Sequence, residues 1–173
     1  MILYHGTIRK WGLNILDKGI DLSFGQKNVD FGRGFYTTVD FDMAKERAIF
    51  LSKKCHDKPV VLKYVFNNDL NDLSIMTFNT PDRSWAQFII NCRAGKRYIS
   101  KLPDHLKVHN INCKYDVCIG PIVDGNVKEI VRKNKKKGTL VSDDDIQEMA
   151  QKDYPIQYSF HSRKALDHLA EGK

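Results

Sequence analysis

Apolar residues recur along the chain at two spacings, which predict short strands interspersed with amphipathic helices. The clearest strand candidate is the run 59–66, which is rich in valine and aromatic residues. Further strands are predicted at 2–5, at the start of 20–28, and at 31–38, 73–78, 115–122 and 156–160. Helices are predicted from Thr7 to Gly19, at 41–53, after Pro81-Asp82, after Ser142 and behind the last strand. Because these elements do not alternate as regular βαβ units, the predicted fold class is α+β.

Residues that favour helix ends mark several of these boundaries. Thr7, Asp40 and Ser142 are each placed to cap a helix N-terminus, and Gly19 stands where a C-terminal glycine is common. Acidic residues follow Ser142, which suits the positive end of the helix dipole. The stretch 123–137 mixes apolar and charged residues without a clear period, so it is expected to be partly loop.

Length and composition indicate one globular domain spanning residues 1–173, with 42% of the residues hydrophobic. No apolar run approaches the ~20 residues needed to cross a bilayer, so no membrane partner is expected. The first residues show no basic segment followed by an apolar one, so no secretory signal is expected. The chain is therefore predicted to be cytoplasmic.

The four cysteines are expected to be reduced and partly buried, as is usual for an unexported chain of this size. His109, Cys113 and Cys118 lie close enough in sequence to suggest a zinc site. A fourth ligand at suitable spacing is missing, so no metal is predicted.

The net charge of +7 is concentrated near 133–137 and 93–101. A basic excess favours anionic partners, such as a phosphate-bearing ligand, a nucleic acid or an acidic protein. The alternative is that the lysine run is only a solvated loop, because a block of like charges repels itself into solvent.

Three places carry candidate chemistry. His5 followed by Gly6 at a strand end can contact a ligand, because glycine permits close approach to the backbone; the alternative is a structural turn. Tyr36 can stack on a planar ring, worth about 1 kcal/mol beyond burial. Strand alternation places Phe35 and Tyr36 on opposite faces, so one of them belongs to the core. Gln157 begins the last strand and can bond hydroxyl groups, but it cannot serve as a general acid or base.

Together these segments resemble the ADP-ribosyltransferase superfamily, on the side of the diphtheria-toxin-like enzymes and poly(ADP-ribose) polymerases. Tyr4-His5-Gly6-Thr7 matches the His-Gly-Ser/Thr segment of a first strand, and Gly19-Ile20 matches the step after the following helix. Phe31-Gly32-Arg33-Gly34-Phe35-Tyr36 matches a Phe-Gly-x-Gly-Ile/Phe-Tyr turn, and Gln157 stands where those enzymes open a late strand with a catalytic glutamate.

The chain is also similar to an uncharacterised bacterial family of such transferase-like proteins. There the middle segment reads Asp-Phe-Gly-x-Gly-Phe-Tyr and the last reads Gln-x-Ser-Phe-His. The match extends to Trp85-Ala86-Gln87-Phe88-Ile89 and Tyr115-Asp116-Val117, so it covers most of the chain.

The resemblance implies a split β-sheet core that grips NAD in a cleft between its strands. It assigns NAD contacts to His5, Gly6, Thr7, Gly34, Phe35 and Tyr36. Gly6 backbone groups would hold the nicotinamide carboxamide, His5 would bond the adenosine-side ribose, and Tyr36 would stack on the nicotinamide. Catalytic roles are implied for His5, Tyr36 and Gln157.

The chain departs from that pattern at three points. Gln157 replaces the glutamate, and removing one preorganised electrostatic contact can cost ~10²–10³ in rate, so Gln157→Glu is expected to raise activity. Ala44 and Arg47 stand where the polymerases have a serine and a second stacking tyrosine. Pro155 replaces the acid that arginine-modifying relatives use, so nothing points to arginine as the acceptor.

The function predicted from the resemblance is mono-ADP-ribosyl transfer from NAD to a protein or nucleic acid, as in a bacterial toxin with a small antitoxin or a defence protein. One alternative is a non-catalytic module that binds NAD or ADP-ribose, motivated by Gln157. The other is an NAD-dependent RNA 2′-phosphotransferase, which needs several arginines, such as Arg9, Arg33 and Arg93, to converge on a phosphate.

Overall fold

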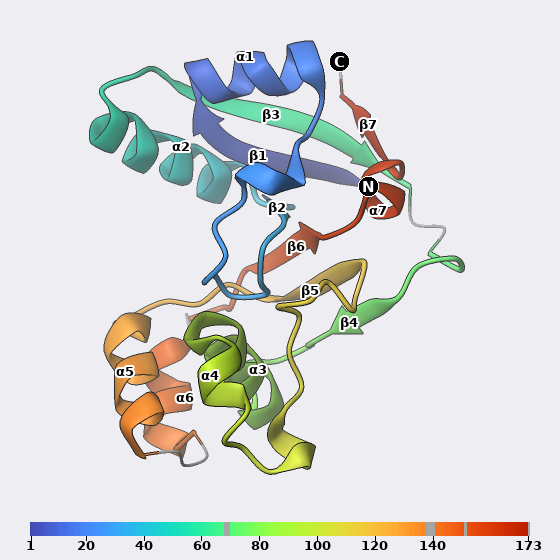
Figure 1. The fold of residues 1–173 in the computed structure, drawn as a ribbon. Helices are drawn as coiled ribbons and strands as arrows, with labels where there is room; N and C mark the ends of the chain where they lie inside the picture. Colours follow the sequence, from blue (N-terminus) through green and yellow to red (C-terminus); the bar gives the residue numbers. More distant parts are fainter. Residues whose placement is uncertain (68–69, 138–140, 151, 173) are drawn as a thin grey trace.

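The computed structural model describes residues 1–67, 70–137, 141–150 and 152–172, and it is an α+β fold as predicted (Figure 1). Within the described residues, seven strands form one sheet in the order β4-β5-β6-β2-β1-β3-β7. Neighbouring strands are antiparallel except β4 and β5, which are parallel. The strands are β1 (Ile2–Ile8), β2 (Phe35–Thr38), β3 (Pro59–Phe66), β4 (Ile75–Thr77), β5 (Val117–Pro121), β6 (Ile156–Phe160) and β7 (Leu169–Glu171).

The helices gather at the two ends of this sheet. They are α1 (Arg9–Lys18), α2 (Phe41–Cys55), α3 (Arg83–Ala94), α4 (Lys96–Ile99), α5 (Val127–Lys137), α6 (Asp143–Met149) and α7 (Arg163–Leu166), with short 3-10 turns at Leu22–Phe24 and Asp104–Leu106. In Figure 1, α1 and α2 flank β1 and β3, whereas α3, α4, α5 and α6 cluster beyond β5.

Two apolar cores pack against the sheet. One joins β1, β3 and β6 to α7, with Leu3, Tyr64 and Phe160 among its buried residues. The other lies around α3, with Trp85 and Phe88 at its centre. Each core buries alternate residues of the strands that it contacts, as the two-residue period of a strand requires.

Several predicted helix ends are confirmed. The Asp40 side chain accepts from the backbone N–H of Asp42 and Met43 at the start of α2. Ser142 and Asp145 form a capping box at the start of α6, and Gly19 follows α1 with a positive φ of 80°.

The first strand runs further than predicted, and Thr7 does not cap a helix. β1 continues to Ile8, because β3 offers it seven consecutive antiparallel pairs from Ile2↔Val65 to Ile8↔Pro59. Helix α1 then begins with Ile8 as its N-cap residue and no side-chain cap. The turn expected at Gly6 is therefore wrong, and Gly6 lies inside a strand.

One further local prediction is wrong, and two others hold only in part. No strand forms in 20–28, where only the 3-10 turn Leu22–Phe24 appears. Most of 123–137 is helix rather than loop, because Ile130, Val131 and Asn134 bury one face of α5. Behind β6, only the single turn of α7 is helical, and Leu169 instead begins β7 beside the end of β3.

The cysteines are partly buried as predicted: Cys92 and Cys118 are buried, Cys55 and Cys113 are exposed, and no disulfide joins them. Among the described residues, no cluster of His, Cys, Asp or Glu is arranged to hold a metal ion. No helix in the described ranges has the length and apolar character needed to cross a membrane.

Candidate functional site

The site is built where β1 and β2 separate, a place we call the fork. Strand β2 pairs with β6 along its whole length but with β1 only at Tyr4↔Thr38, both strands being fully described. Beyond that pair the His5 side chain spans the two strands, and its Nδ1 lies 2.7 Å from the Tyr36 carbonyl oxygen. The fork therefore joins two of the residues that the sequence singled out.

The backbone of Gly6 faces the fork. The Arg9 N–H donates to the Lys58 carbonyl and the Phe66 N–H to the Met1 carbonyl, so the odd-numbered residues of β1 bond β3. Hydrogen-bonding direction alternates along an antiparallel pair, so the N–H and C=O of Gly6 point the other way, toward β2. The N–H donor and the C=O acceptor of Gly6 are therefore both directed at the place where β2 no longer pairs with β1.

Gly6 is also required by the packing of α2. A Cβ at this position would lie 1.9 Å from the Ala44 carbonyl oxygen, a main-chain atom that cannot swing away. α2 covers the face of β1 that carries Gly6, while α1 covers the opposite face, where Gly12 lies beside Thr7 and Val60. Thr7 is only 2% exposed beneath α1, so its side chain is a packing group in this structure.

His5 is held neutral at physiological pH. Burial lowers its pKa to about 4, although the hydrogen bond to the Tyr36 carbonyl acts in the opposite direction, and the Arg47 charge lowers it further. The imidazole stacks on the Phe35 ring at 4.3 Å. Since a carbonyl can only accept, Nδ1 carries the proton and Nε2 is an acceptor, which no hydrogen bond uses among the described residues.

The Tyr36 hydroxyl is fixed in the turn before β2. It accepts from the Phe31 N–H at 2.9 Å and donates to the Gly32 carbonyl at 2.7 Å. Gly32 has a φ of +86°, which glycine adopts without strain. Burial, and then the nearby Asp30 charge, raises the pKa of Tyr36 well above its ordinary value. The phenol is therefore a neutral, structural group, and only the half-buried ring remains for a ligand.

Phe35 and Tyr36 point to opposite faces of β2, as predicted. Phe35 belongs to the core that contains Leu3 and Tyr64, whereas Tyr36 packs against the core around α3. Gly34 lies so close to β6 that a Cβ there would be 2.6 Å from His161 Nδ1. Phe35 and Gly34 therefore influence the fork through packing: Phe35 through its core and Gly34 through its close approach to β6.

Gln157 lies one strand away from the fork, on the face of β2 and β6 that carries Tyr36. It pairs with Thr38 across β2–β6 and is 6% exposed. Its Nε2 donates to Asp30 Oδ2 at 3.2 Å and to the Pro121 carbonyl at 3.3 Å. His5, by contrast, pairs with Leu62 and points to the opposite face, so the two residues can meet one ligand only at the fork.

Sequence reasoning missed Asp30 as a site residue. Its Oδ1 accepts from Arg93 Nε at 2.7 Å and from Arg93 Nη2 at 2.5 Å, while its Oδ2 accepts from Gln157. The available signal was a lone acid directly before the Phe31-Gly32 turn, flanked by apolar residues. That position alone does not reveal partners that lie 63 and 127 residues further along the chain.

Ser159 and His161 form a buried structural pair. Ser159 Oγ lies 2.9 Å from His161 Nε2, and His161 Nδ1 lies 2.8 Å from the Arg33 carbonyl oxygen. Both residues are buried, and burial lowers the pKa of His161 to about 4. The pair ties the turn before β2 to the end of β6 and so fixes one side of the fork.

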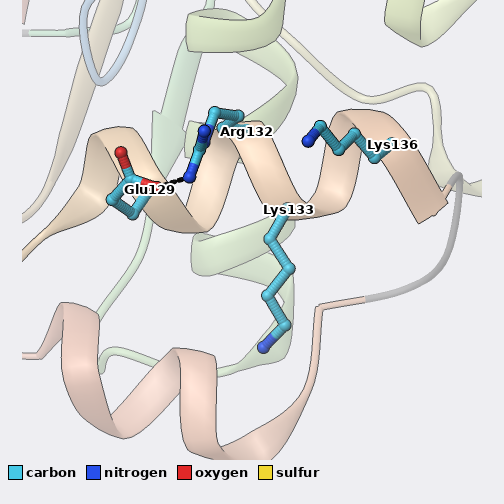
Figure 2. Close-up of a pocket in the computed structure, with 4 residues that line it drawn as sticks. All are labelled: Glu129, Arg132, Lys133 and Lys136. Atoms are coloured by element: carbon cyan, nitrogen blue, oxygen red, sulfur yellow. Dashed lines mark ion pairs between the residues drawn. The ribbon is translucent and has the colours of Figure 1, made fainter.

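Two surface hollows lie outside the fork. One, of about 490 Å³, is lined by the end of α1, residues 19–22, Phe24 and two residues of α7, and it contains the cations Lys18 and Arg163. The other, of about 230 Å³, lies along α5. Figure 2 shows its lining residues Glu129, Arg132, Lys133 and Lys136, with Arg132 paired to Glu129 and Lys133 reaching toward α6.

The fold and the fork define an α+β protein with a polar, histidine-bearing site between two strands of one sheet. The chain belongs to the family described as "Protein of unknown function (DUF3990)", whose model matches residues 1–170. Neither the curated proteins nor the solved structures gave a match to this chain.

Proposed function

We propose that this protein is an NAD-dependent mono-ADP-ribosyltransferase that modifies a macromolecule and binds the nicotinamide half of NAD at the fork. The observation that supports it most is the direction of the Gly6 backbone groups, which face the fork beside a neutral His5. A carboxamide needs one acceptor for its NH₂ group and one donor for its oxygen. The C=O and N–H of Gly6 supply both on one residue.

The other residues at the fork, together with Gln157 on the neighbouring strand β6, supply the remaining contacts. His5 Nε2 accepts a ribose hydroxyl, the Tyr36 ring lies against the nicotinamide, and the Gln157 Oε1 accepts a second hydroxyl. In the reaction, the bond between the ribose carbon and the nicotinamide nitrogen breaks, and its electron pair leaves with neutral nicotinamide. The acceptor's nucleophile then bonds the cationic ribose carbon and releases its proton to water. Holding both fragments in place supplies much of the rate.

The acceptor is a protein or a nucleic acid in this proposal. The exposed cations of α5, such as Lys128, Lys135 and Lys136, would give a phosphate-bearing acceptor affinity without sequence preference. A role as a toxin or defence protein, with a small antitoxin as partner, belongs to the same proposal.

The second candidate is a non-catalytic module that binds NAD or ADP-ribose. The observation in its favour is Gln157, whose neutral amide places no charge of its own at the ribose. The RNA 2′-phosphotransferase alternative is less well supported, because the Arg93 guanidinium is already paired with Asp30.

Incubation with NAD labelled on its adenylate half separates these functions. We expect label to pass to protein or RNA in a lysate, with nicotinamide released in step. His5→Ala should lower transfer at least about tenfold, the equivalent of one lost hydrogen bond. The control is His105→Ala, which removes an exposed histidine far from the fork.

The remaining outcomes are equally informative. Thermal stabilisation by NAD without nicotinamide release would favour the binding module. If NAD neither stabilises the protein against thermal unfolding nor is consumed by it, both candidate functions are wrong.

A further inference from the structure

The orientation of the Gln157 amide follows from its partners. Asp30 Oδ2 and the Pro121 carbonyl oxygen can only accept hydrogen bonds, so the NH₂ group of Gln157 must face them. Trp85 Nε1 donates to the same Pro121 carbonyl at 3.1 Å, which holds that oxygen in place. The Oε1 atom therefore points away from the pair, and no hydrogen bond uses it in the described part of the chain.

Asp30 places a negative charge directly behind this amide. The carboxylate bridges Arg93 and Gln157, with side-chain exposures of 12% for Asp30 and 21% for Arg93. A hydrogen bond to a carboxylate polarises the donor group, and in a weakly solvated site that effect is transmitted along the chain of bonds. The partial negative charge on Oε1 is thereby increased.

We propose that Asp30 is a positioning residue, which fixes Gln157 with Oε1 outward and supplies through it the charge that a glutamate would provide directly. This inference rests on the proposed function, because the charge is needed only if a cationic ribose forms. In this role Asp30 acts through Gln157 and needs no contact with the sugar. In this arrangement Asp30 supplies the negative charge and Gln157 supplies the hydroxyl acceptor. A single catalytic glutamate fills both roles in the transferases that the sequence resembles.

The proposal reverses the expectation for Gln157→Glu drawn from the sequence alone. The new carboxylate would stand about where Nε2 now lies 3.2 Å from Asp30. Two carboxyl groups at that separation cannot both be ionised freely, and the pair shares a proton. The single substitution should therefore impair the site, whereas the swap Asp30→Asn with Gln157→Glu keeps the total charge and restores a donor between the two positions.

Four proteins test this: the native chain, Asp30→Asn, Gln157→Glu and the double swap. The first measurement is nicotinamide release from NAD. We expect each single change to lower kcat about tenfold to a hundredfold with little change in KM, and the swap to recover most of that loss. Asp145→Asn, which alters a buried acid in α6, is the control and should leave release unchanged.

The second measurement needs no NAD: thermal unfolding of the four proteins between pH 5 and pH 8. In the part of the chain that the structure describes, the charged and titratable groups that face Asp30 are Arg93 and Cys92 from α3 and Tyr36 from β2, and all four proteins retain them. In Gln157→Glu, one carboxyl group of the pair binds its proton more tightly folded than unfolded. Its contribution to stability is therefore present at low pH and lost as pH rises. The Tm of Gln157→Glu should fall toward pH 8 relative to the native chain, and the swap should not show this fall.

The two measurements fail separately. If the native chain releases nicotinamide and Asp30→Asn does so equally well, the inference is wrong while the proposed function stands. If the pH dependence behaves as expected but no protein releases nicotinamide, the transferase proposal is wrong, and the catalytic use of Asp30 falls with it. A fully active Gln157→Glu whose stability does not depend on pH would overturn the inference outright.

Discussion

Asp30 and Asp145 are both buried carboxylates paired with a cation, yet their surroundings differ in kind. Among the described residues, Asp145 bonds only groups of α5 and the start of α6: Lys133 at 2.7 Å, and Asn134 and the Ser142 N–H at 3.3 Å each. Asp30 connects α3 to β6 and ends at an amide beside the fork. Burial and ion pairing are therefore shared by a structural and a candidate functional acid. The two acids differ in their partners. Gln157, the amide partner of Asp30, lies beside the candidate site and has a further polar atom, Oε1, that makes no hydrogen bond among the described residues.

The largest difference in folding stability between the two ion pairs is expected when the cation of each pair is removed. Within the described ranges, Arg93→Met leaves the buried Asp30 charge with Gln157 alone as a side-chain partner, and breaking such a pair costs about 3 kcal/mol. Methionine retains the apolar packing of the arginine stem, so the lost charge dominates the effect. Lys133→Met is the matched control, with a smaller loss, because the Lys133 side chain is 46% exposed.

Urea unfolding of the two variants measures this difference, provided that the slope with urea stays constant. Equal losses of stability in Arg93→Met and Lys133→Met would mean that Asp30 depends on its cation no more than Asp145 does. The contrast between the two carboxylates would then disappear.

Patterns within one element were readable from the sequence. The bounds of β3 and β6 follow from local apolar runs, and the caps at Asp40 and Ser142 depend on residues two or three positions away. Alternation along β2 placed Phe35 and Tyr36 on opposite faces. The errors arose where a distant partner decides the outcome, as when β3 extends β1 through Gly6.

The candidate site was predictable to the same extent. His5 and Tyr36 were named from neighbouring glycines and aromatics, and the structure brings them into one hydrogen bond. The Arg93–Asp30–Gln157 network could not be read in the same way, because no local period relates residues from α3, the turn before β2 and β6. The position of Thr7 under α1 likewise depends on helix packing that the sequence pattern does not specify.

As the pH is lowered, the histidines around the fork should lose their contribution to stability at a higher pH than Asp145 of α6 does. Burial lowers the pKa of both His5 and His161 to about 4, while the unfolded chain titrates near 6.5. Between those values the unfolded state binds more protons, so the stability contributed by the neutral histidines is lost as pH falls through this window. His161→Asn should reduce the slope of unfolding free energy with pH, measured between pH 6.5 and pH 4. The exposed His105→Asn is the control for loss of an imidazole at the surface, and an unaltered slope in His161→Asn would show that burial does not govern this window.

The smallest effect is expected from Asp145→Asn, and it occurs at lower pH. Burial alone would raise the pKa of Asp145, but hydrogen bonds from Lys133, Ser142 and Asn134 outweigh burial and leave the pKa below its ordinary value. The stability that this acid contributes is therefore present above the unfolded pKa, near 4, and is lost as pH falls through the lower folded value. Asp145→Asn should cost about 1 kcal/mol at pH 7, typical of a helix cap, and progressively less as the pH is lowered below about 4. If the loss persisted undiminished at pH 2, Asp145 would stabilise α6 by packing rather than by its charge. Its role would then differ from that of Asp30, whose charge is paired with Arg93.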